Sequence, residues 1–203
     1  VVFTPSTNST TNGVISVASA TFTDADGNAN ADGSESNNTT TITVDTVLPT
    51  ITNVTSATAD GTYKQGDLIA ITVSFSEVVN VTATPQLTLE TGGTDAVVNY
   101  TSGTGTNTLT FNYTIGAGEN SLDLDYVATN SLALNGGAIK DAALNDATLT
   151  LAAPGAANSL GANKALIVDT TPPTITNVTA ATADGSYKQG DLIAITVSFS
   201  EVV

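Results

Sequence analysis

The sequence predicts an all-β chain built from tandem β-sandwich domains, one complete and two partial. Two observations lead to this prediction. Thr, Val, Ile, Asn and Gly are abundant among the 203 residues, whereas the helix formers Glu, Lys and Arg are scarce. Branched side chains suit pleated strands, and Asn, Asp and Gly suit turns. In addition, a 35-residue block occurs twice, which indicates repeated units of one fold.

The repeated block covers residues 45–79 and again 169–203. The second copy begins 124 residues after the first, a normal length for one domain with its own core. We therefore expect the end of one domain at 1–45, a complete sandwich at 46–169 and the start of the next domain at 170–203. The copies differ at four aligned pairs: Val47/Thr171, Leu48/Pro172, Ser56/Ala180 and Thr62/Ser186.

Apolar and polar residues alternate in two stretches, which is typical of strands with one buried face. The stretches are 68–76 and 108–115, and their apolar positions are Ile69, Ile71, Val73, Phe75, Leu109, Phe111, Tyr113 and Ile115. Shorter strands are expected at 50–55, 86–90, 96–101, 122–127, 148–151 and 165–168. Gly-rich turns separate these segments, and short strands at this spacing predict a sandwich of two sheets.

The charge of the chain is strongly one-sided. Nineteen acidic residues stand against four lysines, for a formal net charge of −15. Such a surface repels nucleic acid and anionic lipid and attracts cations, although a purely solubilising role is the alternative. No run of residues is long and apolar enough to span a bilayer. We therefore expect no nucleic-acid partner and no membrane insertion in this segment.

Catalysis is not expected from this composition. Without His or Cys the chain has neither an imidazole base nor a thiol nucleophile, and its hydroxyl groups have no obvious activator. Asp123 and Asp125 are the nearest pair of carboxylates for a glycosidase, at i and i+2 of an expected strand. A solvated acidic face explains this pair better.

An Asp- and Asn-rich loop at 24–35 is a candidate calcium site. Oxygen-bearing side chains stand at loop positions 1, 3, 5, 7, 9 and 12, the ligand spacing of an EF-hand. They are Asp24, Asp26, Asn28, Asn30, Asp32 and Glu35. Position 6 is Ala29 instead of Gly and the flanks resemble strands, so we expect a hairpin that wraps Ca²⁺. The alternative is an ordinary Asp-Gly turn with local hydrogen bonds.

Several short motifs recur along the chain. They are V-D-T-x-x-P at the junctions, T-I-T-N-V, D-G-x-Y-x-x-G-D and V-S-F-S-E within the block, and a D-x-x-x-N turn at 141–145, whose spacing also occurs at 24–28. In these motifs the chain resembles bacterial immunoglobulin-like repeats of large secreted adhesins and surface proteins, often exported by the type I (RTX adhesin) route. The resemblance implies tandem immunoglobulin-like β-sandwiches and an extracellular or bacterial cell-surface location.

Strand directions give a second candidate calcium site, at the junctions. The strand at 50–55 leads away from Asp45 and the strand at 68–76 returns, so Glu77 lies at the end where the chain enters the domain. In immunoglobulin topology the loop between the last two strands, here with Asp141 and Asn145, lies at this end too. The next junction repeats half of this set with Asp169 and Glu201. Capping turns and solvated edges are the alternative.

The leading functional expectation is a structural one. We expect a stalk or extension segment of an extracellular bacterial adhesin or matrix fibre, active in cell adhesion and biofilm, with Ca²⁺ stiffening its junctions. Its partners would be the neighbouring immunoglobulin-like domains of the same chain. Two alternatives remain: a filament subunit joined to identical chains by strand complementation, and a module that binds carbohydrate or protein. Because the second block stops at Val203, we expect the chain to be part of a longer array.

Overall fold

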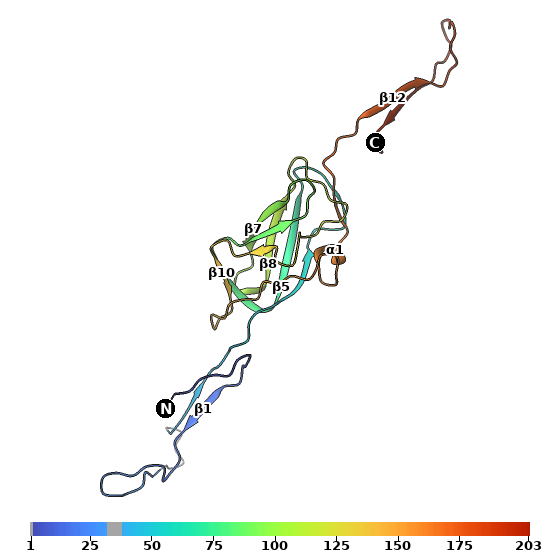
Figure 1. The fold of residues 1–203 in the computed structure, drawn as a ribbon. Helices are drawn as coiled ribbons and strands as arrows, with labels where there is room; N and C mark the ends of the chain where they lie inside the picture. Colours follow the sequence, from blue (N-terminus) through green and yellow to red (C-terminus); the bar gives the residue numbers. More distant parts are fainter. Residues whose placement is uncertain (1, 32–37) are drawn as a thin grey trace.

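The computed structural model describes residues 2–31 and 38–203, and it confirms an all-β chain. Figure 1 shows a central body with a two-stranded sheet extending from each end. On the N-terminal side, β1 (Gly13–Ser16) pairs with β2 (Thr39–Ile42). On the C-terminal side, β12 (Ile175–Ala180) pairs with β13 (Ile195–Phe199). Both pairings are antiparallel.

The body resembles a β-sandwich. Seven strands are joined by hydrogen bonds, six of them in the order β10-β5-β8-β7-β6-β9, with β3 added to β5 outside this path. β11 pairs in parallel with β4, beside the one-turn helix α1. The bounds are β3 (Ile51–Ser56), β4 (Gly61–Tyr63), β5 (Leu68–Thr82), β6 (Gln86–Leu89), β7 (Ala96–Ser102), β8 (Thr106–Thr114), β9 (Leu132–Ala133), β10 (Ala138–Lys140), α1 (Leu160–Asn163) and β11 (Leu166–Val168).

Strand β5 organises the body because it pairs with three other strands. Its first half lies between β3 and β8, and its last residues pair with β10 after a register shift between Ser74 and Val79. The alternating positions predicted to be buried are buried, with Ile69 and Val73 at 0% exposure and Phe75 at 2%. The same holds for the alternating positions of β8. Both form one hydrophobic core with the apolar residues of β6.

The prediction of strands is wrong for two segments. Residues 122–127 and 148–151 form isolated bridges instead of strands. In the first segment, Asp125 accepts hydrogen bonds from the backbone N–H of Tyr126 (2.9 Å) and of Gly155 (2.9 Å), so its side chain points inward. Three consecutive residues are buried here: Leu124, Asp125 and Tyr126. The alternation of buried and exposed side chains that is typical of a strand is therefore lost.

The repeated block folds into the same hairpin twice, and we call residues 45–79 the first hairpin and residues 169–203 the second hairpin. In the first, Val54 pairs with Val73, and in the second, Val178 pairs with Val197. Both ladders shift register after their first pair, between Ile51 and Asn53 and between the equivalent residues of β12. The block therefore encodes strand register locally.

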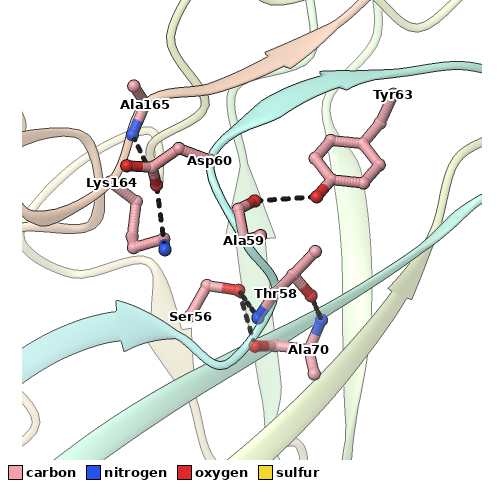
Figure 2. A network of polar contacts seen from close by, with 8 residues as sticks. All are labelled: Ser56, Thr58, Ala59, Asp60, Tyr63, Ala70, Lys164 and Ala165. Atoms are coloured by element: carbon pink, nitrogen blue, oxygen red, sulfur yellow. Dashed lines mark hydrogen bonds and ion pairs between the residues drawn. The ribbon is translucent and has the colours of Figure 1, made fainter.

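The segment that connects β3 to β5, which includes β4, has a network of polar contacts, drawn in Figure 2. Thr58 Oγ1 accepts from the Ala70 N–H (2.9 Å), and the Tyr63 hydroxyl donates to the Ala59 carbonyl (2.7 Å). Both bonds recur in the second hairpin 124 residues later, where the Ala194 N–H donates to Thr182 Oγ1 and the Tyr187 hydroxyl donates to the Ala183 carbonyl. Asp60 differs, since it accepts from Lys164 Nζ (2.8 Å) and the Ala165 N–H (3.3 Å) of the body.

Candidate metal centre

Three carboxylates meet where the chain enters the body. Asp45 lies in the extended segment before β3, Glu77 lies in β5, and Asp141 follows β10. Each residue offers one oxygen, and these oxygens all lie within 4.8 Å of one another. Asp45 and Glu77 are partly buried, and Asp141 is only 2% exposed. The structure thus brings together three residues that the strand directions place at this end, and we call them the acidic triad.

Asn145, the fourth predicted residue, holds the triad's turn in shape. Its backbone N–H donates to Asp141 Oδ1 (2.8 Å) and its side-chain amide donates to Asp141 Oδ2 (2.7 Å). The same amide donates to the carbonyl oxygen of Asp45 (3.1 Å). Asn145 therefore ties the turn to the incoming chain. Each carboxylate oxygen of Asp141 still keeps a lone pair for a cation.

The triad concentrates negative charge at one point. In the described part of the chain, the ion pairs involve other acids: Lys64–Asp67, Lys140–Asp146 and Lys164–Asp60. Loss of hydration, with the neighbouring charges of Asp141 and Asp45, raises the pKa of Glu77 above its ordinary value. A cation at this point would favour the ionised carboxylates and so oppose the shift.

An ion pair beside the turn was missed by the sequence analysis. Lys140 Nζ lies 2.7 Å from Asp146 Oδ1, and the two residues also form an isolated antiparallel bridge. Lys140 Nζ donates to the carbonyl of Leu144 as well (3.5 Å). The signal was a Lys directly before the D-x-x-x-N motif and an Asp directly after it. This pair closes the base of the turn that presents Asp141.

The loop at 24–28 forms the same turn as 141–145. Asp24 Oδ1 accepts from the N–H of Asn28 (2.8 Å) and of Asp26 (3.0 Å), and Asp24 Oδ2 accepts from the Asn28 amide (2.9 Å). The Asn28 amide is the main reason that the pKa of Asp24 is lowered. Asn30 Oδ1 accepts from the N–H of Thr21 (2.8 Å).

These oxygens are used in local hydrogen bonds, and Asp24, Asp26 and Asn28 are exposed. Asp32 and Glu35 lie outside the described residues. Calcium binding by this loop therefore stays a prediction.

The second hairpin repeats two of the three acids. Asp169 Oδ1 accepts from the Thr171 N–H (2.9 Å), as Asp45 Oδ1 accepts from the Val47 N–H (3.1 Å). Glu201 follows β13 and is exposed. The position equivalent to Asp141 would lie 124 residues further along, outside this sequence. Asp169 and Glu201 are thus the sequence counterparts of Asp45 and Glu77, and metal binding by them stays a prediction.

The opposite end of the body holds the outgoing chain through hydrogen bonds. The N–H of Thr170 donates to Asn120 Oδ1 (2.8 Å), and Thr170 Oγ1 accepts from the Gly118 N–H (3.1 Å). Glu119, an acid of the same turn, accepts from the Tyr113 hydroxyl (2.6 Å). Burial, with a smaller contribution from Glu119, raises the pKa of the Tyr113 phenol. The hydrogen bonds of Thr170 fix the outgoing segment to the body.

Comparison with known proteins gives no match. No protein-family model matches the chain, and no curated protein or solved structure matches it at a significant level. Among the described residues, no helix is both long and apolar enough to cross a membrane.

Proposed function

We propose that this chain is a structural extension segment of an extracellular bacterial adhesin or matrix fibre. In this proposal its units are tandem immunoglobulin-like sandwiches, and Ca²⁺ bound by the acidic triad stiffens the junction before each unit. The role is mechanical, and no catalytic step is assigned to any residue. The acidic triad at the incoming junction is the observation that carries the proposal.

The triad has the dimensions of a calcium site. Ca²⁺ takes six to eight oxygen ligands at about 2.3–2.6 Å, so two oxygens on opposite sides of one ion lie about 5 Å apart. The 4.8 Å limit that contains the oxygens of Asp45, Glu77 and Asp141 fits within this span. Three carboxylates supply up to six oxygens, and water can complete the shell. Soft-metal ligands are absent because the chain has no Cys, Met or His.

An ion at the triad would join the incoming segment to the body. Asp45 belongs to that segment, whereas Glu77 and Asp141 belong to the body. The hydrogen bond from Asn145 to the Asp45 carbonyl already makes this connection once. A divalent cation would remove the repulsion among the three acids and add a second connection. The junction would then resist bending.

The path of the chain also suits a rod. Figure 1 shows that the segment arriving from the sheet of β1 and the segment leading to β12 join the body at opposite ends. Asp169 is held there because its N–H donates to the carbonyl of Tyr63 (2.9 Å), at the end of β4. Units that enter at one end and leave at the other extend an array with each repeat.

Calorimetric titration of the 203-residue chain with Ca²⁺ tests the proposal, with Glu77→Gln as the variant. Glu201→Gln is a matched control, because it makes the same change at the equivalent position outside the triad. We expect wild type and E201Q to bind and E77Q to lose binding by at least tenfold. At 100 times the dissociation constant, Ca²⁺ should stabilise wild type by about 2.7 kcal/mol. Equal binding by E77Q and wild type would refute the site.

A further inference from the structure

Thr46, the last residue of the first V-D-T motif, is bound by the segment that precedes β1. Its N–H donates to the carbonyl of Ser9 (3.0 Å), and its Oγ1 accepts from the Ser9 N–H (2.9 Å). The same hydroxyl donates to the carbonyl of Ser6 (2.7 Å). We call residues 2–44, described outside 32–37, the N-terminal segment. Thr46 thus ties the chain that enters the body to the N-terminal segment behind it.

Thr170, the last residue of the second V-D-T motif, uses the same two groups. Its N–H donates to Asn120 Oδ1 (2.8 Å), and its Oγ1 accepts from the Gly118 N–H (3.1 Å). Both partners belong to the body, which the chain is leaving at this point. The acceptor of the N–H is an amide side chain here and a carbonyl at Thr46. The role of the threonine is therefore the same at both junctions, although its partners differ in sequence.

The two turns that bind the threonines share a backbone shape. Each has a residue with a positive φ, 56° at Asn8 and 83° at Gly118. Asn and Gly are the residues that adopt this left-handed conformation most readily. The residue directly after Asn8 is Ser9, the main partner of Thr46. Each threonine therefore meets a left-handed turn of the part of the chain that it leaves.

Strand pairing gives the two threonines the same place. In the N-terminal segment, β2 pairs with β1 in antiparallel direction, and the bonds of Thr46 with Ser9 continue this pairing. In the body, Val168 forms an antiparallel bridge with Ser121, and Thr170 continues it along the same turn. The same arrangement forms twice from different turn sequences. This repetition indicates a defined device at the junctions.

Asp45 and Thr46 are bound to opposite sides of the first junction. The Asp45 carbonyl accepts from the Asn145 amide of the body (3.1 Å), whereas Thr46 binds the N-terminal segment. The earlier residue therefore holds the later part of the chain, and the later residue holds the earlier part. The Cα atoms of neighbouring residues are only about 3.8 Å apart. No free linker residue remains between the two attachments, in contrast to a flexible linker.

We propose that Thr46 and Thr170 are positioning residues, whose hydroxyls fix the direction of the chain at the two junctions. Each threonine fixes the outgoing chain to the part that it leaves, and at the first junction Asp45 fixes it to the body as well. The N-terminal segment and the body then turn together instead of independently. The bonds of the threonines join uncharged groups and need no cation. The proposal is therefore independent of the proposed calcium site.

Distances between spin labels, measured by pulsed electron spin resonance on the 203-residue chain in chelator, test the proposal. One label at Val97→Cys on β7 and a second at Thr41→Cys on β2 form the first-junction pair. Val97→Cys with Thr196→Cys on β13 forms the second-junction pair. All three side chains are exposed, and the chain has no native Cys to take up a label.

Thr46→Val should broaden the distances of the first-junction pair by about twofold or more and leave the second-junction pair unchanged, because valine keeps the shape but loses the hydroxyl. Thr170→Val should do the reverse, so each variant is the matched control of the other. T46S and T170S should match wild type, since serine keeps the hydroxyl. Wild-type widths in both valine variants, or equal broadening by the exposed Thr174→Val, would overturn the proposal.

Thermal unfolding of the same variants separates positioning from folding. Both valine variants should keep the cooperative melt of the body, within about 4 °C of wild type, because neither threonine belongs to the hydrophobic core. Asn120→Ala removes the acceptor of the Thr170 N–H and should broaden the second-junction pair further in T170V. Loss of the cooperative melt in T170V would make Thr170 part of the fold of the body and overturn its role as a positioning residue.

Discussion

Single residues in the two D-x-x-x-N turns show how one motif tolerates different sequences. The fourth position has a positive φ in both turns, 87° at Gly27 and 72° at Leu144. Glycine adopts this conformation without strain, whereas leucine does not. The side chain of Leu144 is 72% exposed, so no burial offsets the strain. The turn that presents Asp141 to the triad is therefore less stable than its hydrogen bonds alone would make it.

Replacing Leu144 by Gly should stabilise the chain by about 0.5 kcal/mol, because relief of strain outweighs the entropy that glycine loses on folding. Leu122→Gly is the matched control. Leu122 is 91% exposed and has no positive φ, so this change should destabilise by about 0.5–1 kcal/mol. Urea unfolding measures both. A lower free energy of unfolding for L144G would show that the Leu144 side chain makes a stabilising contact.

Asp60 and Asp184 share a sequence context but not their partners. Lys164, the main cause, and the Ala165 N–H lower the pKa of Asp60 below its ordinary value of 3.8. An acid with a lowered folded pKa stabilises the fold above its unfolded pKa, and this contribution is lost as the pH falls through the folded pKa. Asp60→Asn should lower the melting temperature slightly at pH 7, since the Asp60 side chain is 59% exposed and solvent screens the pair. The difference from wild type should shrink as the pH falls from 3.8 through the lowered folded pKa of Asp60.

Asp184→Asn is the control for this change. It should leave the main melting transition unchanged at pH 7 and in acid, because Lys164 pairs with Asp60. Equal effects of the two substitutions would mean that the ion pair with Lys164 contributes nothing.

At the scale of the elements, the two hairpins separate local from tertiary contributions. The two long strands pair in the same register in both copies and share turn bonds, whereas β4 forms only in the first copy, which residues 80–168 cover. Pairing within the hairpin is thus set by β-branched residues and turn chemistry. The covering strands supply the burial.

Val54→Ala and Val178→Ala should therefore have unequal effects. Val54 is fully buried, and its truncation should cost about 1–3 kcal/mol through lost transfer energy and the resulting cavity. Val178 is 60% exposed, so the same change there should cost less than about 0.5 kcal/mol. Thermal unfolding by circular dichroism compares them. Similar losses at both sites would show that the second hairpin is covered in solution.

Some elements were too short for sequence patterns to reveal. β4, β9 and β10 contain two or three residues each, and alternation cannot be read over so few positions. Residues 122–127 show the opposite error, because the alternation expected from the sequence is interrupted where Asp125 is buried between Leu124 and Tyr126. Asp125 accepts one of its hydrogen bonds from the Gly155 N–H, which lies in a loop 30 residues away that no local pattern contains.

At the scale of the whole molecule, the junction before the body should respond to calcium. We expect small-angle scattering of the 203-residue chain to give a longer and narrower distribution of distances with Ca²⁺ than with chelator. The reason is that an ion at Asp45 restricts the incoming segment relative to Glu77 and Asp141. E77Q should resemble the chelated wild type in both conditions. Unchanged scattering with a confirmed bound ion would mean that the ion does not stiffen the junction.

The sequence by itself determined the all-β class, the main core positions and the shape of the repeated hairpin, because these follow from alternation, branched side chains and turn residues close in the chain. It also indicated which acids could converge at the junction. The tertiary structure decided how they meet. Asn145 donates to the Asp45 carbonyl, and one carboxylate oxygen from each acid of the triad lies within 4.8 Å of the other two. It also decided that identical hairpins differ in burial, because burial depends on which distant strands cover a face.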